Sequence, residues 1–130
     1  MKPVLVDTSA WVDFLRPGIR PIGERVDELL ESDRARVCGV VVAELLHGVR
    51  GAGEHRQMKY LFETVRRVPT QEDDWDAVGN TMHRLREKGI TVPLTDVMIA
   101  TIARRNGIAV LTADSHFRHL GVELVEADAS

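Results

Sequence analysis

A chain of 130 residues, 44% hydrophobic and 28% charged, has the size and composition of one soluble globular domain. We expect a single domain over residues 1–130, because no segment is biased enough in composition to indicate a linker or disorder. The longest apolar run, residues 37–43, is far shorter than the roughly 18 residues that span a bilayer, so we expect no membrane association and a cytoplasmic location. The only cysteine, Cys38, lies in that run, and we expect it in the core.

The net charge of −3 at pH 7 differs from the basic excess that proteins binding nucleic acids usually carry. This average is misleading, because neutralising four acidic side chains with bound cations would leave a charge of +1. Arginine supplies 14 of the 17 basic residues, and its guanidinium group is well suited to binding phosphate. Charge alone therefore does not exclude a nucleic-acid substrate.

The first half of the chain alternates short apolar runs with segments of helical periodicity. Thr8 and Ser9, which follow the first apolar run, are typical of a helix start. In chain order we expect a strand over residues 4–6, helices over 10–15 and 23–32, a strand over 36–39, and helices over 40–50 and from 54 onward. The last of these is amphipathic, with one apolar face made by Met58, Leu61, Phe62 and Val65.

The second half continues this alternation. Thr70 and Asp73 have the spacing of a capping box, Gly89 suits a helix end, and Thr95 is expected to cap the next helix. The expected elements are a helix from the capping box to residue 89, a helix over 96–105, and strands over 108–112 and 122–125. Strands that alternate with helices form parallel sheets covered on both faces. The predicted fold class is therefore α/β, with three α/β/α layers around a central, mainly parallel sheet.

Two acidic residues follow predicted strands. Asp7 comes directly after the strand over 4–6, and Asp114 follows the strand over 108–112 with one residue between them. Ligands of open α/β sheets bind beyond the carboxyl ends of the strands. We therefore expect Asp7 and Asp114 at one edge of the sheet, as candidate catalytic residues.

Asp96 and Glu44 are two further candidates. Asp96 lies in the first turn of a predicted helix, where the helix dipole favours its ionised form, although an ordinary helix start would look the same. Glu44 has apolar or small neighbours on its predicted helix, among them Leu45 and Gly48, so we expect no solvated face around it. A carboxylate there needs an arginine partner or a hard cation, and both interpretations remain open.

Four carboxylates gathered in a partly desolvated site would repel one another strongly. A divalent ion that prefers oxygen ligands is the simplest compensation, and such an ion suits the hydrolysis of phosphodiesters. The sequence therefore predicts a Mg²⁺ site, in which Mn²⁺ can substitute, formed by Asp7, Glu44, Asp96 and Asp114.

The four segments that carry these acids together resemble PIN-domain ribonucleases, and most closely the VapC-type toxins. They are residues 4–11, 42–48, 95–100 and 111–117, in the family's order and at its usual separations. The resemblance covers essentially the whole chain and implies a three-layer α/β fold. It also implies RNA cleavage that leaves a 5′-phosphate, dependence on Mg²⁺ or Mn²⁺, and neutralisation by a cognate VapB-like antitoxin.

The resemblance also implies roles for the acids. Asp7, Asp96 and Asp114 would bind the metal, with Asp7 and Asp96 as direct ligands. Glu44 would complete the quartet and orient a water molecule.

The polar residues beside the acids match the family's pattern less uniformly. Thr8, Ser9 and Thr112 match small polar positions that would support the acids or bind the substrate phosphate. His116 departs from the pattern, because many relatives carry a second acid two residues after Asp114. That puts a fifth acidic ligand in doubt, and His116 would either meet the substrate phosphate or have no catalytic role.

Other hypotheses remain to be weighed against an RNA-cleaving enzyme. A phosphoryl-transfer domain of the haloacid-phosphatase or response-receiver kind also has an Asp after its first strand, but Ser9 stands where the phosphatases use a second Asp. A catalytically inactive RNA- or protein-binding module of the same fold is the non-enzyme alternative. The five histidines show no spacing typical of zinc ligands, so we expect surface or capping roles for them.

Apolar residues outside the acidic segments bear on assembly. The amphipathic face over residues 58–65, together with the family resemblance, predicts a homodimer. The larger aromatic residues are expected in the core or in dimer contacts rather than under bases of the substrate; these are Trp11, Phe14, Trp75 and Phe117.

Overall fold

The computed structural model describes residues 1–125, and its centre is a four-stranded sheet in which all strands are parallel. The strands are β1 (Val4–Val6), β2 (Ala35–Val37), β3 (Arg66–Arg67) and β4 (Ala109–Leu111), in the order β3-β2-β1-β4. Val6 lies opposite Leu111, so β1 and β4 end side by side, and the residues that follow them lie at the same edge of the sheet.

Six α-helices and a short 3₁₀ helix surround this sheet within the described residues. They are α1 (Thr8–Leu15), α2 (Pro21–Glu31), α3 (Gly39–Gly48), α4 (Gly51–Thr64), α5 (Glu72–Glu87), α6 (Leu94–Arg105) and the 3₁₀ helix η1 (Ser115–His119). Within residues 1–125, no helix has the length and apolar character needed to cross a membrane.

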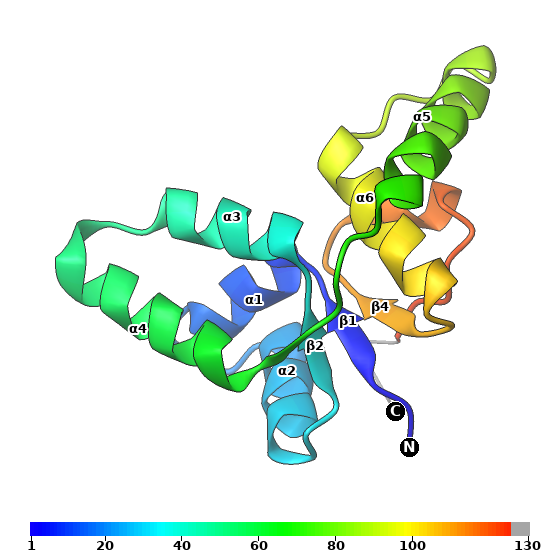
Figure 1. The fold of residues 1–130 in the computed structure, drawn as a ribbon. Helices are drawn as coiled ribbons and strands as arrows, with labels where there is room; N and C mark the ends of the chain where they lie inside the picture. The colour runs from blue at the N-terminus through cyan, green and yellow to red at the C-terminus, as the bar shows by residue number, and fades with distance from the viewer. Residues whose placement is uncertain (126–130) are drawn as a thin grey trace.

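The strand order determines which helices cover which face. From β1 to β3 the chain moves towards one edge through α1 to α4, and it then returns to the opposite edge through α5 and α6. Because parallel crossovers are right-handed, this reversal places α5 and α6 on the other face. Figure 1 shows α1 to α4 on one side of the sheet and α5 and α6 on the other. The predicted α/β class with three layers is confirmed.

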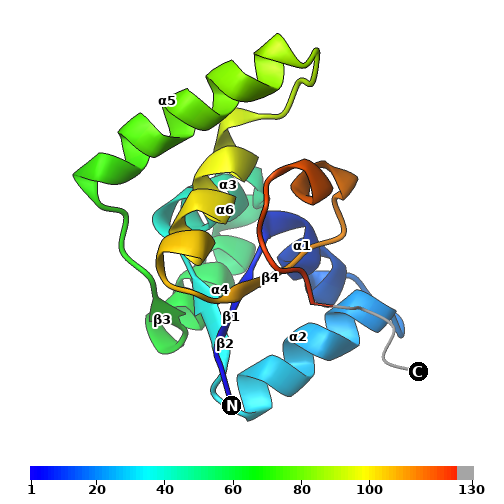
Figure 2. The same ribbon diagram turned by 90° about the vertical axis from the view of Figure 1, so that its right-hand side faces the viewer.

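The core fixes the two helices that carry the acids. In α6 every residue from Asp96 to Ala103 is buried, and Figure 2 shows this helix between the sheet and the outer helix α5. Trp11 of α1 is fully buried; its indole N–H donates a hydrogen bond to the Val6 carbonyl at 3.1 Å, and its ring packs edge-on against Phe62. Both helices are therefore held rigidly against the carboxyl edge of the sheet.

Cys38 is buried and free, as predicted. Burial raises the pKa of its thiol to about 11, so this side chain is an inert part of the core.

Several predicted boundaries differ from the structure. Helix α6 begins at Leu94 with Pro93 as its N-cap, so Thr95 lies inside the helix rather than at its cap. The capping residue of α5 is Gln71, whose backbone N–H donates to the Asp74 carboxylate at 2.8 Å, one position later than the predicted pair Thr70 and Asp73. Strand β3 was not predicted, because its two exposed arginines carry no apolar signal.

A further prediction needs correction. The predicted strand over 122–125 is reduced to a single parallel bridge between Val110 and Leu124. The apolar face of α4 packs largely inside its own chain, since Met58, Phe62 and Val65 are buried and Leu61 is partly buried, and the homodimer remains a prediction. Trp75 is 49% exposed and lies outside the core, so its alternative place in a dimer contact remains a prediction, whereas the core positions predicted for Trp11 and Phe117 are confirmed.

Candidate active site

Asp7 lies at the carboxyl edge of the sheet, at the junction of β1 and α1. Its backbone N–H donates to the carbonyl of Leu111 in β4, and its own carbonyl accepts from Trp11 in the first turn of α1. The residue is only 2% exposed. The backbone around Asp7 is thus fully engaged, and this leaves the side chain as its only free functional group.

Two hydroxyl groups hold the Asp7 carboxylate in place. The hydroxyls of Ser9 and Thr112 each donate to Asp7 Oδ2 at 2.7 Å, one from α1 and the other from the end of β4. Ser9 Oγ in turn accepts from the backbone N–H of Ala113, and Thr112 Oγ1 accepts from that of Asp114. Both hydroxyls bind the same oxygen, so Oδ1 of Asp7 is left for a ligand.

Asp96 reaches the same edge from the opposite face of the sheet, in the first turn of α6. It is 8% exposed, and its pKa is raised to about 6. Burial is the largest cause, and the negative charges of Asp7 and Asp114 add to it, while the contact with His116 acts in the opposite direction. The structure therefore brings Asp7, Asp96 and Asp114 close enough for their charges to interact.

Asp114 and His116 come from the turn that leads into η1. The Asp114 carboxylate caps this short helix by accepting the backbone N–H of His116 at 2.9 Å. The imidazole Nδ1 of His116 lies 3.0 Å from Asp114 Oδ1 and 3.3 Å from Asp96 Oδ2. One ligand atom from each of these three side chains falls within 4.8 Å of the other two.

Glu44 occupies a different environment from the one that the sequence predicted. Its neighbours Val41, Val42 and Leu45 face the core, but Ala43, Glu44 and Gly48 lie on the exposed side of α3. The expectation that no solvated face surrounds Glu44 is therefore wrong: small neighbours on this helix leave open surface instead of marking close packing.

Thr8 links Glu44 to the other acids. Its hydroxyl donates to Glu44 Oε1 at 2.7 Å, across from α1 to α3. Because Thr8 directly follows Asp7 in the chain, this hydrogen bond holds the Glu44 carboxylate at the rim of the same site. Among residues 1–125, Asp7 and Glu44 fall outside the close group of Asp96, Asp114 and His116.

The polar residues predicted beside the acids do contact them. Ser9 and Thr112 bind Asp7, and Thr8 binds Glu44, so all three hydroxyls support carboxylates. A role for them in binding substrate remains a prediction. His116 is the residue that sequence reasoning missed, because neither role considered for it included contact with the acids. Its position two residues after Asp114, in a predicted turn, was the available signal.

The donor set fits a divalent ion. Carboxylate oxygens predominate, and Asp7 Oδ1 is not bound by the hydroxyls that hold Oδ2. Burial is the main reason that the pKa of Asp96 is raised, and the negative charges of Asp7 and Asp114, which a cation would offset, add to it. The residues that could hold such an ion are Asp7, Asp96, Asp114 and His116, with Glu44 at the rim.

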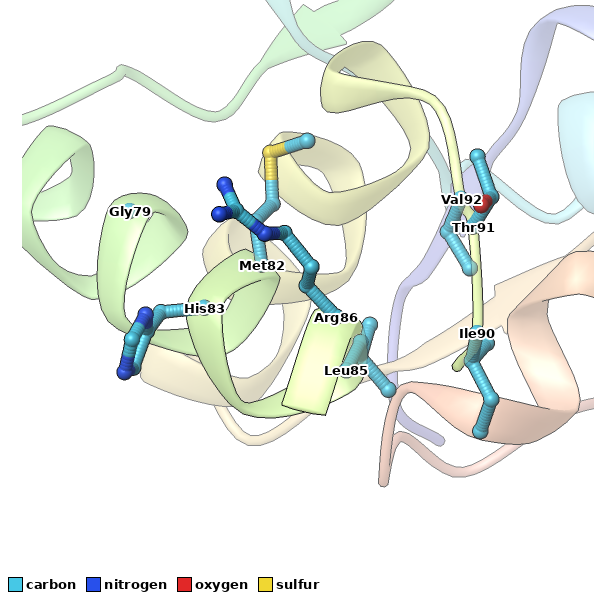
Figure 3. A pocket seen from close by; sticks show the side chains of 8 residues that line it. All are labelled: Gly79, Met82, His83, Leu85, Arg86, Ile90, Thr91 and Val92. Atoms are coloured by element: carbon cyan, nitrogen blue, oxygen red, sulfur yellow. The ribbon is translucent and has the colours of Figure 1, made fainter. Parts of the chain in front are cut away.

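A separate hollow on the α5 face has a different character. It has a volume of about 350 Å³ and lies between the end of α5 and the segment that leads into α6 (Figure 3). Its walls are mainly apolar, made by Met82, Leu85, Ile90 and Val92, and none of the four acids lines it. The chemistry of the molecule is therefore concentrated at the edge of the sheet.

The fold and the site define a class: a three-layer α/β/α domain with acidic side chains gathered where neighbouring parallel strands end. Comparison with known proteins identifies the family. The PIN domain family matches residues 4–123, so the chain belongs to the PIN-domain family, as the resemblance of its motifs indicated.

Individual relatives agree with this assignment over nearly their full length. Ribonuclease VapC11 of Mycobacterium tuberculosis is 28% identical over 118 residues, which cover 88% of this chain and 88% of the relative. The structure of FitAcB from Neisseria gonorrhoeae matches with a TM-score of 0.76 and 20% identity, over 95% of this chain and 97% of that one. DNA-bound VapBC from Salmonella typhimurium matches with a TM-score of 0.75 and 21% identity, over 97% and 98% of the two chains. The two solved structures support the fold.

Proposed function

We propose that this protein is a divalent-ion-dependent ribonuclease that hydrolyses RNA phosphodiester bonds, and that it is the toxin of a VapBC-like toxin–antitoxin pair acting in the cytoplasm. The observation that carries the proposal is the convergence of Asp7, Asp96 and Asp114 at the carboxyl edge of the sheet in a PIN domain. The relative named ribonuclease VapC11 supports RNA as the substrate class.

Each acid has a role in this proposal. Asp7 and Asp96 are the most buried of the quartet, and they would bind the ion directly, with Asp114 as a further ligand. Glu44 is exposed, so it would orient water or substrate at the rim rather than hold the ion. Thr8, Ser9 and Thr112 keep these carboxylates in position, and in this proposal they would also bind the substrate phosphate.

Mg²⁺ is the proposed ion, with Mn²⁺ able to substitute. When bound, it would supply positive charge that polarises the scissile phosphate and activates water. The chain's own contribution is to fix carboxylate oxygens on three separate elements, β1, α6 and the turn after β4, so that little reorganisation is needed when the ion arrives.

Cleavage of RNA in vitro tests the proposal. Purified protein should cut mixed RNA in Mg²⁺, should stop cutting in excess chelator, and should recover when Mg²⁺ or Mn²⁺ is restored. The fragments should carry 5′-phosphates, which can be read by end-specific ligation. RNA that stays intact in every condition would contradict the proposal and would favour an inactive binding module.

An antitoxin is the proposed protein partner. A hollow of about 300 Å³ between α1, α3 and α4 begins at Thr8 and Glu44 and continues over Val12, Leu15 and Met58. An antitoxin segment with apolar side chains and a basic group would match this surface and cover the acids. The VapBC complex among the similar structures supports a partner of this kind.

A substitution in the hollow between α1, α3 and α4 can test whether the antitoxin binds there. Leu15 is 47% exposed and makes none of the hydrogen bonds that hold the acids, so Leu15→Glu should leave cleavage intact. Co-expression of the cognate VapB-like antitoxin should suppress cleavage by the natural protein and suppress it less for Leu15→Glu. Equal suppression of both would place the antitoxin elsewhere.

A homodimer is also proposed, as the family resemblance implies, although the face of α4 predicted to form it is buried within the chain. The remaining apolar surface for self-association includes Trp75 and Leu94, which are 49% and 47% exposed. Light scattering at micromolar concentration should give twice the monomer mass of 14.5 kDa. A monomeric mass would contradict the dimer.

A further inference from the structure

His116 lies within the acidic site, where its imidazole contacts two of the carboxylates. Its imidazole Nδ1 lies 3.0 Å from Asp114 Oδ1 and 3.3 Å from Asp96 Oδ2, and its side chain is 45% exposed. The turn into η1 fixes this arrangement, because the backbone N–H of His116 binds Asp114 Oδ1 at 2.9 Å. Asp114 and His116 thus present an oxygen and a nitrogen from one rigid turn towards Asp96 on α6.

We propose that His116 Nδ1 is a ligand of the divalent ion, beside Asp96 and Asp114, and that this nitrogen makes the site prefer a first-row transition-metal ion over Mg²⁺. The inference rests on the proposed ion site and concerns which ion that site selects. A site with oxygen ligands alone would accept Mg²⁺ and Mn²⁺ alike, whereas a site with this nitrogen would distinguish them.

The distances suit adjacent positions in one coordination shell. Ligands at right angles around an ion, each about 2.1 Å from it, lie about 3 Å apart. The separations from Nδ1 to the two carboxylate oxygens are 3.0 and 3.3 Å. A hydrogen bond from Nδ1–H would have the same length, so the two arrangements must be separated by experiment.

Ligand chemistry sets the direction of the preference. Mg²⁺ takes oxygen ligands and gives up its waters reluctantly, whereas imidazole nitrogen is a common ligand of transition-metal ions. A nitrogen donor therefore adds little for Mg²⁺ and more for an ion such as Mn²⁺. An imidazole nitrogen binds a metal ion only without its proton, and the other ring nitrogen then carries the proton of the neutral ring.

The first test compares ion affinities of the full-length protein. Mn²⁺ binding can be measured from the electron paramagnetic resonance signal of the free ion, and Mg²⁺ binding from competition against Mn²⁺. His116→Asp keeps a donor at this position but changes nitrogen to oxygen, so the preference for Mn²⁺ over Mg²⁺ should fall by about tenfold or more. His83→Asn is the matched control, because His83 is an exposed histidine beside a carboxylate, 3.4 Å from Glu87 on α5. This control should keep the preference unchanged.

The second test detects the nitrogen directly. Pulsed electron paramagnetic resonance of bound Mn²⁺ should reveal coupling to a coordinated ¹⁴N nucleus in the natural protein and in His83→Asn, and the coupling should be lost in His116→Asp. Thermal unfolding in chelator establishes that each variant is folded. If His116→Asp does not fold, the ¹⁴N signal of the natural protein decides the matter alone.

The outcomes separate this inference from the proposed function. Bound Mn²⁺ without ¹⁴N coupling, or an unchanged preference in folded His116→Asp, would overturn the role of His116 as a ligand while leaving the ribonuclease proposal intact. Absence of any Mn²⁺ or Mg²⁺ binding by the natural protein would overturn both.

Discussion

Two buried carboxylates in this protein occupy equivalent positions in neighbouring helices but have opposite electrostatic surroundings. Asp74 lies in the first turn of α5 and Asp96 in the first turn of α6, so the helix dipole favours the ionised form of each. Asp74 accepts hydrogen bonds from Arg105 Nε at 2.8 Å and Nη2 at 2.9 Å. These hydrogen bonds are the main reason that the pKa of Asp74 is lowered.

Asp96 has no comparable partner within residues 1–125. Its nearest basic group is His116 Nδ1 at 3.3 Å, and burial together with the charges of Asp7 and Asp114 raises its pKa to about 6. At Asp74 the free-energy cost of burying a charge is offset by Arg105 of the same chain. At Asp96 a bound cation would have to offset it. A buried acid with an arginine partner thus supports the fold, whereas buried acids without one, such as Asp7 and Asp96, indicate a candidate functional site.

Among these tests, Asp96→Asn should change the rate of RNA cleavage most. Cleavage of RNA should fall by roughly a thousandfold, as expected when a group that organises charge at the reacting centre is lost. Stability in chelator should stay equal or rise, because the substitution removes repulsion among the acids. Single-turnover cleavage and thermal unfolding measure the two quantities, and strong destabilisation would instead assign Asp96 a structural role.

The second test is expected to lower the stability of the fold, whereas Asp96→Asn should leave it equal or raise it. Asp74→Asn should lower the free energy of unfolding by about 2 kcal/mol, because it removes the charge that accepts two hydrogen bonds from the Arg105 guanidinium. Asp33→Asn is the matched control: it removes the pair with Arg66, in which both side chains are about two-thirds exposed, and should cost less than about 1 kcal/mol. Urea denaturation measures both. Equal losses would mean that burial does not distinguish the two pairs.

The pattern of strands followed by acids was sufficient to predict the edge of the sheet at which Asp7 and Asp114 lie. Parallel strands end at a common edge, so local sequence and one general rule of topology fix these positions. Ser9 and Thr112 were identified beside the acids only through the family resemblance, and their hydrogen bonds to Asp7 agree with it.

Tertiary packing decided what the sequence could not reveal. Glu44 was expected to be enclosed because its neighbours are small or apolar, yet which side of α3 faces the sheet depends on how the helix docks. The pair of Asp74 with Arg105 joins helices α5 and α6 across 31 positions, and no periodicity within either helix signals it. The contact of His116 with Asp96 likewise exists only once η1 packs beside α6.

The third test concerns how the free energy of unfolding depends on pH, and Asp96 is the residue expected to cause this dependence. In the unfolded, metal-free chain this carboxyl loses its proton near the ordinary value of 3.8, but in the folded protein only near pH 6. Its stabilising contribution is therefore complete below the lower value and is lost as the pH rises through the higher one. Relative to Asp96→Asn, the natural protein should lose on the order of 2 kcal/mol between pH 4 and pH 7 in chelator.

Asp74 provides the internal control for this measurement. Because its pKa is lowered, its contribution is present above the ordinary value and is lost as the pH falls below it, outside the window in which Asp96 titrates. The difference between natural protein and Asp96→Asn should therefore vary only above about pH 4. A flat difference across the window would contradict the account of Asp96.

The smallest expected effect concerns the exposed acid of the quartet, which needs neither an arginine nor a cation to be stable. Glu44→Gln should leave the free energy of unfolding unchanged and reduce cleavage by about tenfold, since it alters a group that orients rather than holds the ion. Thr8→Val removes the hydroxyl that fixes Glu44 Oε1 at 2.7 Å and should cause much of the same loss. In the double variant the two losses should not add, because both act through one hydrogen bond. A loss for Glu44→Gln as large as that for Asp96→Asn would place Glu44 among the ion ligands despite its exposure.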